Sequence, residues 1–356
     1  MPAPDTPLTV LRVFLRLGLT SFGGPIAHLG YFRTELVVRR QWVSDAQFAQ
    51  LVALCQLLPG PTSSQVGMAI ALTRAGAWGA VASFVGFTAP SALLMYAIAR
   101  SATAWPAGLA TRITQALTLV ALAVVAHALW RMAQRLLTDA PRAGIALLTG
   151  TVVTFVHHSL AQVLALGLAA TAGLALRLSL PQTSLNLPAF GVSRRAASIA
   201  GGVLLILVAA ALLLPVGAPS LATLALQCAR AGALVFGGAH VVLPMLEQSF
   251  VSAQWVSADA LLAGYGAAQL MPGPLFSVAA YLGAVVPVGV APWIAAGLAV
   301  LAIYTPGVLA LVAVLPAWGR LVANARAQRA LAGLSAGVVG LLAAVFAELL
   351  LRNVLR

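Results

Sequence analysis

Long apolar runs separated by short polar connectors cover most of this chain. The runs occupy residues 143–155, 160–176, 198–214, 290–315 and 331–351. Most approach or exceed the roughly 20 residues that a helix needs to cross the hydrocarbon core of a bilayer. The runs are continuous rather than alternating, which excludes a porin-like barrel. The pattern predicts an all-α integral membrane protein, a polytopic helical bundle with about ten to thirteen membrane segments.

Two Pro-Gly-Pro triplets interrupt otherwise helix-compatible runs. Pro59-Gly60-Pro61 lies shortly after Gln56, and Pro272-Gly273-Pro274 lies shortly after Gln269. Proline donates no backbone hydrogen bond and clashes with the preceding turn, while the glycine permits a sharp bend. We therefore expect each triplet to split one membrane segment into two half-helices.

The triplets belong to a longer internal repeat, in which blocks recur in the same order at a nearly constant spacing. The matched blocks are Arg16-Leu17-Gly18 with Arg230-Ala231-Gly232, Phe22-Gly23-Gly24 with Phe236-Gly237-Gly238, Trp42-Val43-Ser44 with Trp255-Val256-Ser257, the two triplets with a Gln before and a Ser after, and Thr88-Ala89-Pro90 with Tyr304-Thr305-Pro306. Such similarity is typical of transporters built by duplication. We predict a first transporter repeat at 8–137, connecting helices with a polar linker at 138–219, and a second repeat at 220–356.

Loop charges indicate that the second repeat is inverted relative to the first. The loop after the first Gly-Gly pair carries Arg33, Arg39 and Arg40, whereas its counterpart at 244–259 carries no arginine. Equivalent loops of opposite bias should face opposite sides of the membrane, with the basic loop in the cytoplasm. An odd number of expected helices between the copies gives the same result. The predicted fold therefore consists of two inverted-topology repeats with broken helices.

Composition agrees with membrane insertion and narrows the possible partners. The chain is 61% hydrophobic and only 8% charged, which lies outside the range of soluble globular proteins. All 20 basic residues are arginines, against 7 acids. They are scattered through the loops, where the positive-inside rule expects many of them. The excess charge therefore does not indicate a nucleic-acid partner.

Polar residues gather where each half-helix begins after its triplet. Thr62, Ser63, Ser64 and Gln65 follow the first triplet, and Ser277 follows the second. A helix N-terminus with proline in its first turn offers backbone N–H groups and partial positive charge to an anion. Two such breaks related by a pseudo-two-fold axis would converge near the bilayer midplane. The alternative is that both breaks are kinks needed only for packing.

The glycine pairs and two arginines extend this candidate site. Paired glycines suggest a second bend, or close helix packing alone. An arginine at membrane depth usually faces a partner or an aqueous cavity, although its side chain can also extend to the interface. The candidate substrate-binding residues are Arg16, Gly23, Gly24, Gln56, Gly60, Thr62, Ser63, Ser64, Gln65, Arg230, Gly237, Gly238, Gln269, Gly273 and Ser277.

Four titratable residues are candidates for proton coupling. His28 and His240 follow the two glycine pairs, and Glu35 and Glu247 lie beyond them. Each could exchange a proton during transport. The alternatives are packing for the histidines and interface positions for the glutamates.

No enzymatic motif appears in the chain. It has no nucleophile elbow, phosphate-binding loop, dinucleotide fingerprint or zinc-ligand spacing. Cys55 and Cys228 occupy different repeat positions, so we expect neither a disulfide nor a metal between them. We therefore expect no catalytic residues, no metal and no cofactor, and an energy source other than ATP.

The motifs resemble those of the chromate ion transporter family in its long-chain, two-domain form. They are Phe22-Gly23-Gly24-Pro25-Ile26-Ala27-His28, Trp42 and Leu58-Pro59-Gly60-Pro61 with Gln65 in the first half, and Phe236-Gly237-Gly238, Val242-Leu243-Pro244, Trp255, Ala268-Gln269, Pro272-Gly273-Pro274-Leu275-Phe276 and Tyr281-Leu282-Gly283 in the second. Ala239 replaces an expected third glycine. The resemblance covers both copies and leaves the central connector without motifs.

The resemblance implies a multi-pass inner-membrane carrier that exports chromate and confers resistance to it. A dianion leaving a negative-inside cell gains about 4.6 kcal/mol per 100 mV, so the membrane potential alone could drive export, with or without a proton gradient. The implied partners are chromate, sulfate as a competitor, membrane lipids and a second copy in a homodimer. Two alternatives stay open: an uptake carrier for sulfate or a related oxyanion, and a membrane enzyme or flippase that handles lipid phosphates.

Overall fold

The computed structural model describes residues 5–101, 107–156, 161–178, 190–214, 217–236, 241–318 and 324–353, and this part of the chain is helical without strands. Five of its helices are long and apolar enough to cross a membrane: Thr62–Ser101, Arg112–Leu136, Arg194–Leu213, Pro292–Ala317 and Ala325–Leu351. Four further apolar helices are shorter. The prediction of an all-α polytopic membrane protein is confirmed, and several of the expected segments are short helices beside bends.

The chain forms two compact units. Unit 1 combines residues 1–118 with 185–316, and unit 2 combines residues 119–184 with 317–356. Each unit therefore draws on both halves of the sequence. α5 (Ala107–Leu136) crosses from the first unit into the second.

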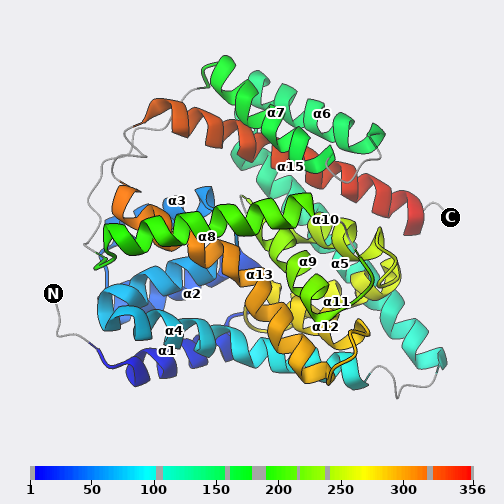
Figure 1. Cartoon of the computed structure of the whole chain (residues 1–356), viewed down its shortest axis with the longest axis horizontal. Coiled ribbons are helices and arrows are strands. Elements are labelled where there is room, and N and C mark those ends of the chain that lie inside the picture. The colour runs from blue at the N-terminus through cyan, green and yellow to red at the C-terminus, as the bar shows by residue number, and fades with distance from the viewer. Residues whose placement is uncertain are drawn as a thin grey trace. The chain divides into compact units, whose positions relative to one another are not determined.

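Unit 1 contains the motifs of both repeat copies (Figure 1). The first copy supplies α1 (Pro7–Thr20), α2 (Gly24–Phe32), the π-helical segment η1 (Arg33–Arg39), α3 (Asp45–Leu57) and α4 (Thr62–Ser101). The second supplies α9 (Leu221–Leu234), α10 (Val242–Leu246), η4 (Glu247–Val251), α11 (Ala258–Leu270), η5 (Leu275–Ser277), α12 (Val278–Val285), α13 (Pro292–Val314) and η6 (Leu315–Ala317). α8 (Arg194–Leu213) precedes the second copy and packs on α9 and α13.

Matched glycines hold matched helix pairs together in the two copies. α1 packs on α4 and α9 packs on α13. A Cβ on Gly18 of α1 would lie 2.7 Å from the backbone oxygen of Gly86, and one on Gly232 of α9 would overlap the backbone oxygen of Ile303. Only glycine permits such an approach. The sequence repeat therefore has a counterpart in helix packing.

α4 is two helices joined at a kink. Ala75 and Gly76 leave helical geometry, and Gly76 has a φ of 62°. In the second copy Gly289, with a φ of 76°, lies in the connection between α12 and α13. Each copy therefore continues from its triplet through a half-helix and a left-handed glycine into a longer helix. The sequence did not predict the Ala75–Gly76 kink.

The Trp-Val-Ser blocks also adopt the same local structure. In each copy a π-helical segment is followed within three residues by a glutamine with positive φ, 52° for Gln41 and 58° for Gln254. The tryptophan after it donates its backbone N–H to a carbonyl in the π segment. Ser44 and Ser257 then cap α3 and α11 by accepting a hydrogen bond from a backbone N–H of the first turn.

Unit 2 is a tightly packed group formed by α6 (Ala140–Phe155), α7 (Ala161–Ala175), α15 (Ala325–Asn353) and the end of α5. α6, α7 and α15 lie side by side (Figure 1). A Cβ on Gly150 would lie 3.1 Å from the backbone oxygen of Gly340, and one on Gly173 would lie 2.8 Å from the Cα of Gly333. Small residues replace interlocking side chains here, as is common between membrane helices.

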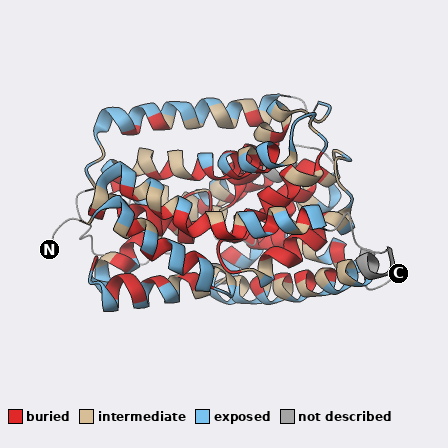
Figure 2. Cartoon of the chain, turned by 90° about the horizontal axis from the view of Figure 1, so that it is seen from below, coloured by how far each residue is buried: buried red, intermediate tan, exposed pale blue. Residues whose placement is uncertain are grey.

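Large apolar side chains cover much of the outer surface. Leu213 is 80% exposed, Leu147 74% and Leu205 72%. Figure 2 shows helices that are buried along most of their length beside others that are mostly exposed. Exposed leucine on apolar helices of spanning length fits contact with lipid chains.

Candidate functional site

Both Pro-Gly-Pro triplets break their helices as predicted. α3 ends at Leu57 and α4 begins at Thr62, while α11 ends at Leu270 and η5 begins at Leu275. Gly60 has a φ of 106° and Gly273 a φ of 99°, which side-chain-bearing residues rarely adopt. The glycine of each triplet is therefore required by the backbone conformation of the bend.

Each break is hydrogen-bonded to the opposite repeat copy. The N–H of Gly60 donates to the carbonyl of Val235 at 2.8 Å, and the N–H of Gly273 donates to the carbonyl of Ser21 at 2.9 Å. Val235 and Ser21 are the residues directly before the two Phe-Gly-Gly blocks. The two bonds therefore join the triplet of each copy to the residue that precedes the Phe-Gly-Gly block of the other.

Each break also packs against a helix of the opposite copy. A Cβ on Gly60 would lie 2.8 Å from the Cα of Gly307, and one on Gly273 would lie 2.8 Å from the Oγ of Ser91. Gly307 and Ser91 follow the matched prolines Pro306 and Pro90. Each break thus lies against the proline-containing helix of the other copy.

Gln65 fastens the first break to α13. Its Nε2 donates to the carbonyl of Pro59 at 2.7 Å and to the carbonyl of Gly307 at 2.9 Å. Its Oε1 is buried and has no hydrogen-bond partner among the described residues. Val278 occupies the corresponding place after Ser277, so the second copy lacks this clamp.

Five buried hydroxyl groups belong to the segments that meet at the two breaks, and contact among the hydroxyls is seen for Ser64, Thr88 and Tyr304. We call the five residues the hydroxyl cluster: Ser21, Ser64, Thr88, Ser277 and Tyr304. All five are at most 4% exposed. The Tyr304 hydroxyl interacts with those of Thr88 and Ser64. Apart from this contact, none of the five hydroxyls has a hydrogen-bond partner of normal geometry among the described residues. The rings of Phe84 and Phe276 flank Tyr304 at 4.9 and 5.5 Å.

The hydroxyl cluster has a chemical consequence. A buried polar group without a partner costs about 1–3 kcal/mol, so several together need a ligand or water to supply the missing bonds. All five members are neutral and can donate a hydrogen bond. Thr88 with Tyr304 and Ser64 with Ser277 are also matched repeat positions. The arrangement suits a small oxyanion held by donors from both copies.

Other predicted site residues around the first break bond to neighbouring helices. The Thr62 hydroxyl donates to the carbonyl of Cys55 at 3.5 Å, and Ser63 Oγ lies 3.5 Å from Nδ1 of His28. Gln56 and Gln269 are half-buried in the last turns before the breaks, and Gln269 interacts with the hydroxyl of Tyr265. The hydroxyls of Thr62 and Ser63 are therefore engaged by other groups at the first break.

The two matched arginines have different environments. Arg16 is exposed on α1, whereas Arg230 on α9 is only 5% exposed. The structure therefore does not bring Arg16 to the buried hydroxyl cluster. For Arg230, anion binding stays a prediction from sequence.

The glycine bends are described for one copy only. Gly23 and Gly24 have φ values of 92° and 74° and connect α1 to α2. Gly237, Gly238 and His240 lie outside the described residues.

Three of the four coupling candidates are buried side chains. His28 is 1% exposed, and its ring contacts Phe87 edge to face at 5.3 Å. Glu35 accepts hydrogen bonds from Arg40 at 2.8 Å and Arg39 at 3.3 Å. Burial raises the pKa of Glu35, but the two arginines outweigh it and leave the pKa below its ordinary value. Glu247 is 9% exposed in η4, and its backbone carbonyl accepts the N–H of the residue that follows the π segment, as the carbonyl of Glu35 does in η1.

An ion pair that the sequence did not predict fastens the chain's start to α4. Arg74 is 6% exposed and bonds to the Asp5 carboxylate at 2.7 and 2.9 Å. Its guanidinium lies 5.9 Å from the centre of the Trp42 ring, over which Arg40 also lies at 5.5 Å. The pair sits directly before the α4 kink. Because the two residues are far apart in sequence and in no shared motif, no sequence signal links them.

The sequence also did not identify Ser21, Thr88 and Tyr304 as site residues. Thr88 and Tyr304 appeared only as aligned positions in the repeat, so their alignment was the available signal. For Ser21 the signal was its position directly before Phe22-Gly23-Gly24.

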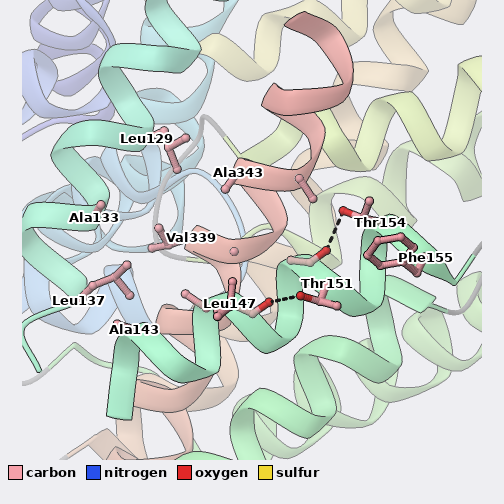
Figure 3. A pocket seen from close by; sticks show the side chains of 14 residues that line it. Leu129, Ala133, Leu137, Ala143, Leu147, Thr151, Thr154, Phe155, Val339 and Ala343 are labelled. Atoms are coloured by element: carbon pink, nitrogen blue, oxygen red, sulfur yellow. Dashed lines mark hydrogen bonds between the residues drawn. The ribbon is translucent and has the colours of Figure 1, made fainter. Parts of the chain in front are cut away.

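A cavity in unit 2 is unsuited to an anion. It measures about 460 Å³ and is lined by apolar side chains of α5, α6 and α15, including Leu129, Phe155 and Val339 (Figure 3). The hydroxyls of Thr151 and Thr154 donate to carbonyls of their own helix at 2.9 Å. They therefore offer no free donor proton to this cavity.

Comparison with known proteins points to a single family of transporters. The chromate transporter family model matches residues 8–174 and 222–355. The chromate transport protein of Pseudomonas aeruginosa is 26% identical over 98% of this chain and 82% of its own length. A probable chromate transport protein of Synechococcus elongatus is 27% identical over 76% of this chain and 67% of its own length. No solved structure matches the chain. With the family model matching both repeat copies and a relative aligned along nearly the whole chain, the protein belongs to the chromate transporter family.

Proposed function

We propose that this protein is a secondary transporter that carries chromate across the membrane and binds it at the hydroxyl cluster. The observation that carries the proposal is the group of buried, neutral hydroxyls without hydrogen bonds of normal geometry, beside two helix breaks that each bond to the opposite repeat copy. Family membership and the names of the relatives support chromate as the cargo. The naming of these relatives as transport proteins favours transport over enzymatic action on lipid phosphates.

Donor geometry explains how a neutral site could hold an anion. Ser64 lies in the first turn of the half-helix that begins at Thr62, where backbone N–H groups carry partial positive charge. Tyr304 and Thr88 add donors from α13 and from the second half of α4. Fixed donors in a water-poor site are worth more than the same groups in water. A tetrahedral oxyanion fits such donors because each of its oxygens can accept several hydrogen bonds.

Movement of the two copies would open the site to alternate sides. We infer inverted copies, because the loop with Arg39 and Arg40 is basic and its counterpart near Glu247 is not. Since each break is bonded to the residue before the other copy's Phe-Gly-Gly block, a tilt of one copy would carry part of the other with it. Such rocking around a fixed midplane site is the usual mode of inverted-repeat transporters.

Export is the direction that we propose. An anion leaving a negative-inside cell gains about 2.3 kcal/mol per charge per 100 mV, which needs no ATP. In an inner membrane this flux would lower cytoplasmic chromate and confer resistance. Proton coupling through His28 would add to the driving force without being required.

Flux through the purified protein in liposomes tests the proposal. Chromate efflux should require the protein and rise when the inside is made negative. Ser64→Ala, Thr88→Ala and Tyr304→Phe should each weaken apparent chromate affinity by about 5–30 fold, because each removes one donor worth about 1–2 kcal/mol.

Thr305→Ala is the matched control, since Thr305 is the exposed neighbour of Tyr304 and its hydroxyl donates to the carbonyl of Leu301 at 2.7 Å. It should leave affinity unchanged. Flux of labelled sulfate with no flux of chromate would replace the proposal by the sulfate carrier. Absence of both fluxes would exclude oxyanion transport.

A further inference from the structure

We propose that the species carried through the site is the singly protonated oxyanion, hydrogen chromate, whose O–H donates to Oε1 of Gln65. The inference rests on the proposed function and specifies its substrate. It follows from the orientation of one side chain, from the absence of formal charge in the hydroxyl cluster, and from the chemistry of the cargo.

The orientation of the Gln65 amide is fixed by its own contacts. Nε2 donates to two backbone carbonyls, those of Pro59 and Gly307, at 2.7 and 2.9 Å. Reversing the amide would place Oε1 against two carbonyl oxygens, which are both acceptors. The oxygen therefore faces away from these carbonyls and can act only as an acceptor.

This oxygen needs a donor that the described residues do not supply. Gln65 is 1% exposed, and no described donor lies within hydrogen-bonding range of Oε1. A fully deprotonated oxyanion offers acceptors alone, so it would leave Oε1 unsatisfied or repel it. A singly protonated oxyanion offers one O–H and otherwise accepts, which matches the single acceptor of Gln65 together with the hydroxyl donors of Ser64, the preceding residue, and of Tyr304.

Desolvation also favours the monoanion. Ser64, Thr88 and Tyr304 carry no charge at neutral pH, and neither does Gln65. The cost of moving an ion out of water grows with the square of its charge, so a monoanion costs about a quarter of what a dianion does. Neutral donors can offset the smaller cost more readily.

The proton balance is simple. Chromate takes one proton from water on the loading side, crosses as hydrogen chromate, and releases the proton on the other side. Chromium keeps its oxidation state and its four oxygens. The cycle moves one negative charge per chromate instead of two and carries one proton with it.

Protonation also separates chromate from its isosteres. Chromate takes up its first proton near neutral pH, whereas sulfate and selenate do so only in strong acid. At neutral pH only chromate supplies a donor for Gln65. The site would therefore distinguish ions of similar shape by the presence of one hydrogen.

Protein groups could also titrate in this range and must be separated from the cargo. The titratable side chains on the helices packed against α4 are Arg12 and Arg16 on α1, His28 and Tyr31 on α2, Asp45 and Cys55 on α3, Asp259 and Tyr265 on α11, Tyr281 on α12 and Tyr304 on α13. Of these types, histidine ordinarily titrates near neutral pH. Protonation of His28 would strengthen binding of every oxyanion, whereas protonation of the cargo affects chromate alone.

Equilibrium binding of chromate and selenate to the purified full chain, from about pH 6 to about pH 8, separates these cases. The apparent Kd for chromate should rise by on the order of tenfold per pH unit on the alkaline side, while that for selenate stays flat. A chromate affinity that is independent of pH, or parallel changes for both anions, overturns the inference. Failure to bind chromate at any pH overturns the proposed function instead.

Gln65→Met supplies the variant test, because it keeps the length of the side chain and removes Oε1. It also removes the two hydrogen bonds of Nε2, so the chromate-to-selenate ratio and the pH profile are compared, not the absolute affinity. It should abolish the preference for chromate over selenate and flatten the pH profile. Gln227→Met is the matched control, since Gln227 is also 1% exposed with an Oε1 that lacks a partner, but it lies on α9. An unchanged pH profile of chromate binding in Gln65→Met contradicts the assignment. Equal loss of the preference for chromate over selenate in both variants contradicts it as well. If Gln65→Met does not fold, the comparison of chromate with selenate on the unmodified protein still decides.

Discussion

At the scale of single residues, the glycines of the triplets carry two separate constraints. Gly60 has a φ of 106°, and a Cβ there would also lie 2.8 Å from the Cα of Gly307. Gly289 has a φ of 76° but open space around it. Comparing substitutions at Gly60 and Gly289 therefore separates the energetic cost of a positive φ from the cost of close contact between the two copies.

Gly60→Ala should lower the thermal unfolding midpoint of the detergent-purified protein clearly more than Gly289→Ala. Positive φ costs about 1–3 kcal/mol in either variant, and overlap with Gly307 adds to the cost only at Gly60. Intrinsic tryptophan fluorescence, recorded as the temperature rises, measures the unfolding midpoint of both variants. Equal losses would show that Gly60 and Gly307 do not pack as described.

Part of the proposed site could be predicted from the sequence, and part could not, for identifiable reasons. Thr62, Ser63, Ser64 and Gln65 were predicted because they adjoin a recognisable break. Tyr304 was missed because a lone tyrosine in an apolar run ordinarily indicates packing, and only folding places it beside Ser64. The opposite environments of Arg16 and Arg230 likewise depend on which face of each helix is covered.

At the scale of elements, the breaks were predictable and their anchors were not. Proline and glycine act locally, so helix ends at Leu57 and Leu270 follow from sequence. The hydrogen bonds from Gly60 to Val235 and from Gly273 to Ser21 join distant segments. The kink at Ala75–Gly76 had no proline to mark it, and a lone glycine in a helical run is weak evidence of a break.

Asp5→Asn should destabilise the start of the chain at the α4 kink. It removes the carboxylate from the buried Arg74 guanidinium, and breaking such a pair costs about 3–5 kcal/mol when it is fully buried. Asp5 itself is 20% exposed, so we expect about half of that or less.

Asp45→Asn is the control, because the Arg33–Asp45 pair is 54% and 62% exposed and should contribute little. Limited proteolysis of the N-terminal segment and the thermal midpoint measure both variants. Equal behaviour of the two would exclude a stabilising role for the Asp5–Arg74 pair.

At the scale of the whole molecule, the repeat connects sequence, packing and the proposed mechanism. Packing of α1 on α4 and of α9 on α13, and the π segments before Trp42 and Trp255, show that matched blocks fold alike. The all-α membrane class followed from the long continuous apolar runs. The grouping into two units did not, because each unit draws on segments from both halves of the chain.

Opposite orientation of the two copies has a direct topological test. Gln41 and Gln254 are exposed, matched positions with φ values of 52° and 58°. In Gln41→Cys a membrane-impermeant maleimide should react from the cytoplasmic side, and in Gln254→Cys from the other side. The native Cys55 and Cys228 are buried and give the background. Reaction of both variants from the same side would exclude inversion.

The position of bound chromate tests the central claim most directly. A structure of the protein with chromate, located by the anomalous scattering of chromium, should place the ion within hydrogen-bonding distance of Ser64, Thr88 and Tyr304, beside Gln65. Chromium found at Arg230 or on the exposed surface near Arg16, with the hydroxyl cluster filled by water, would contradict the account.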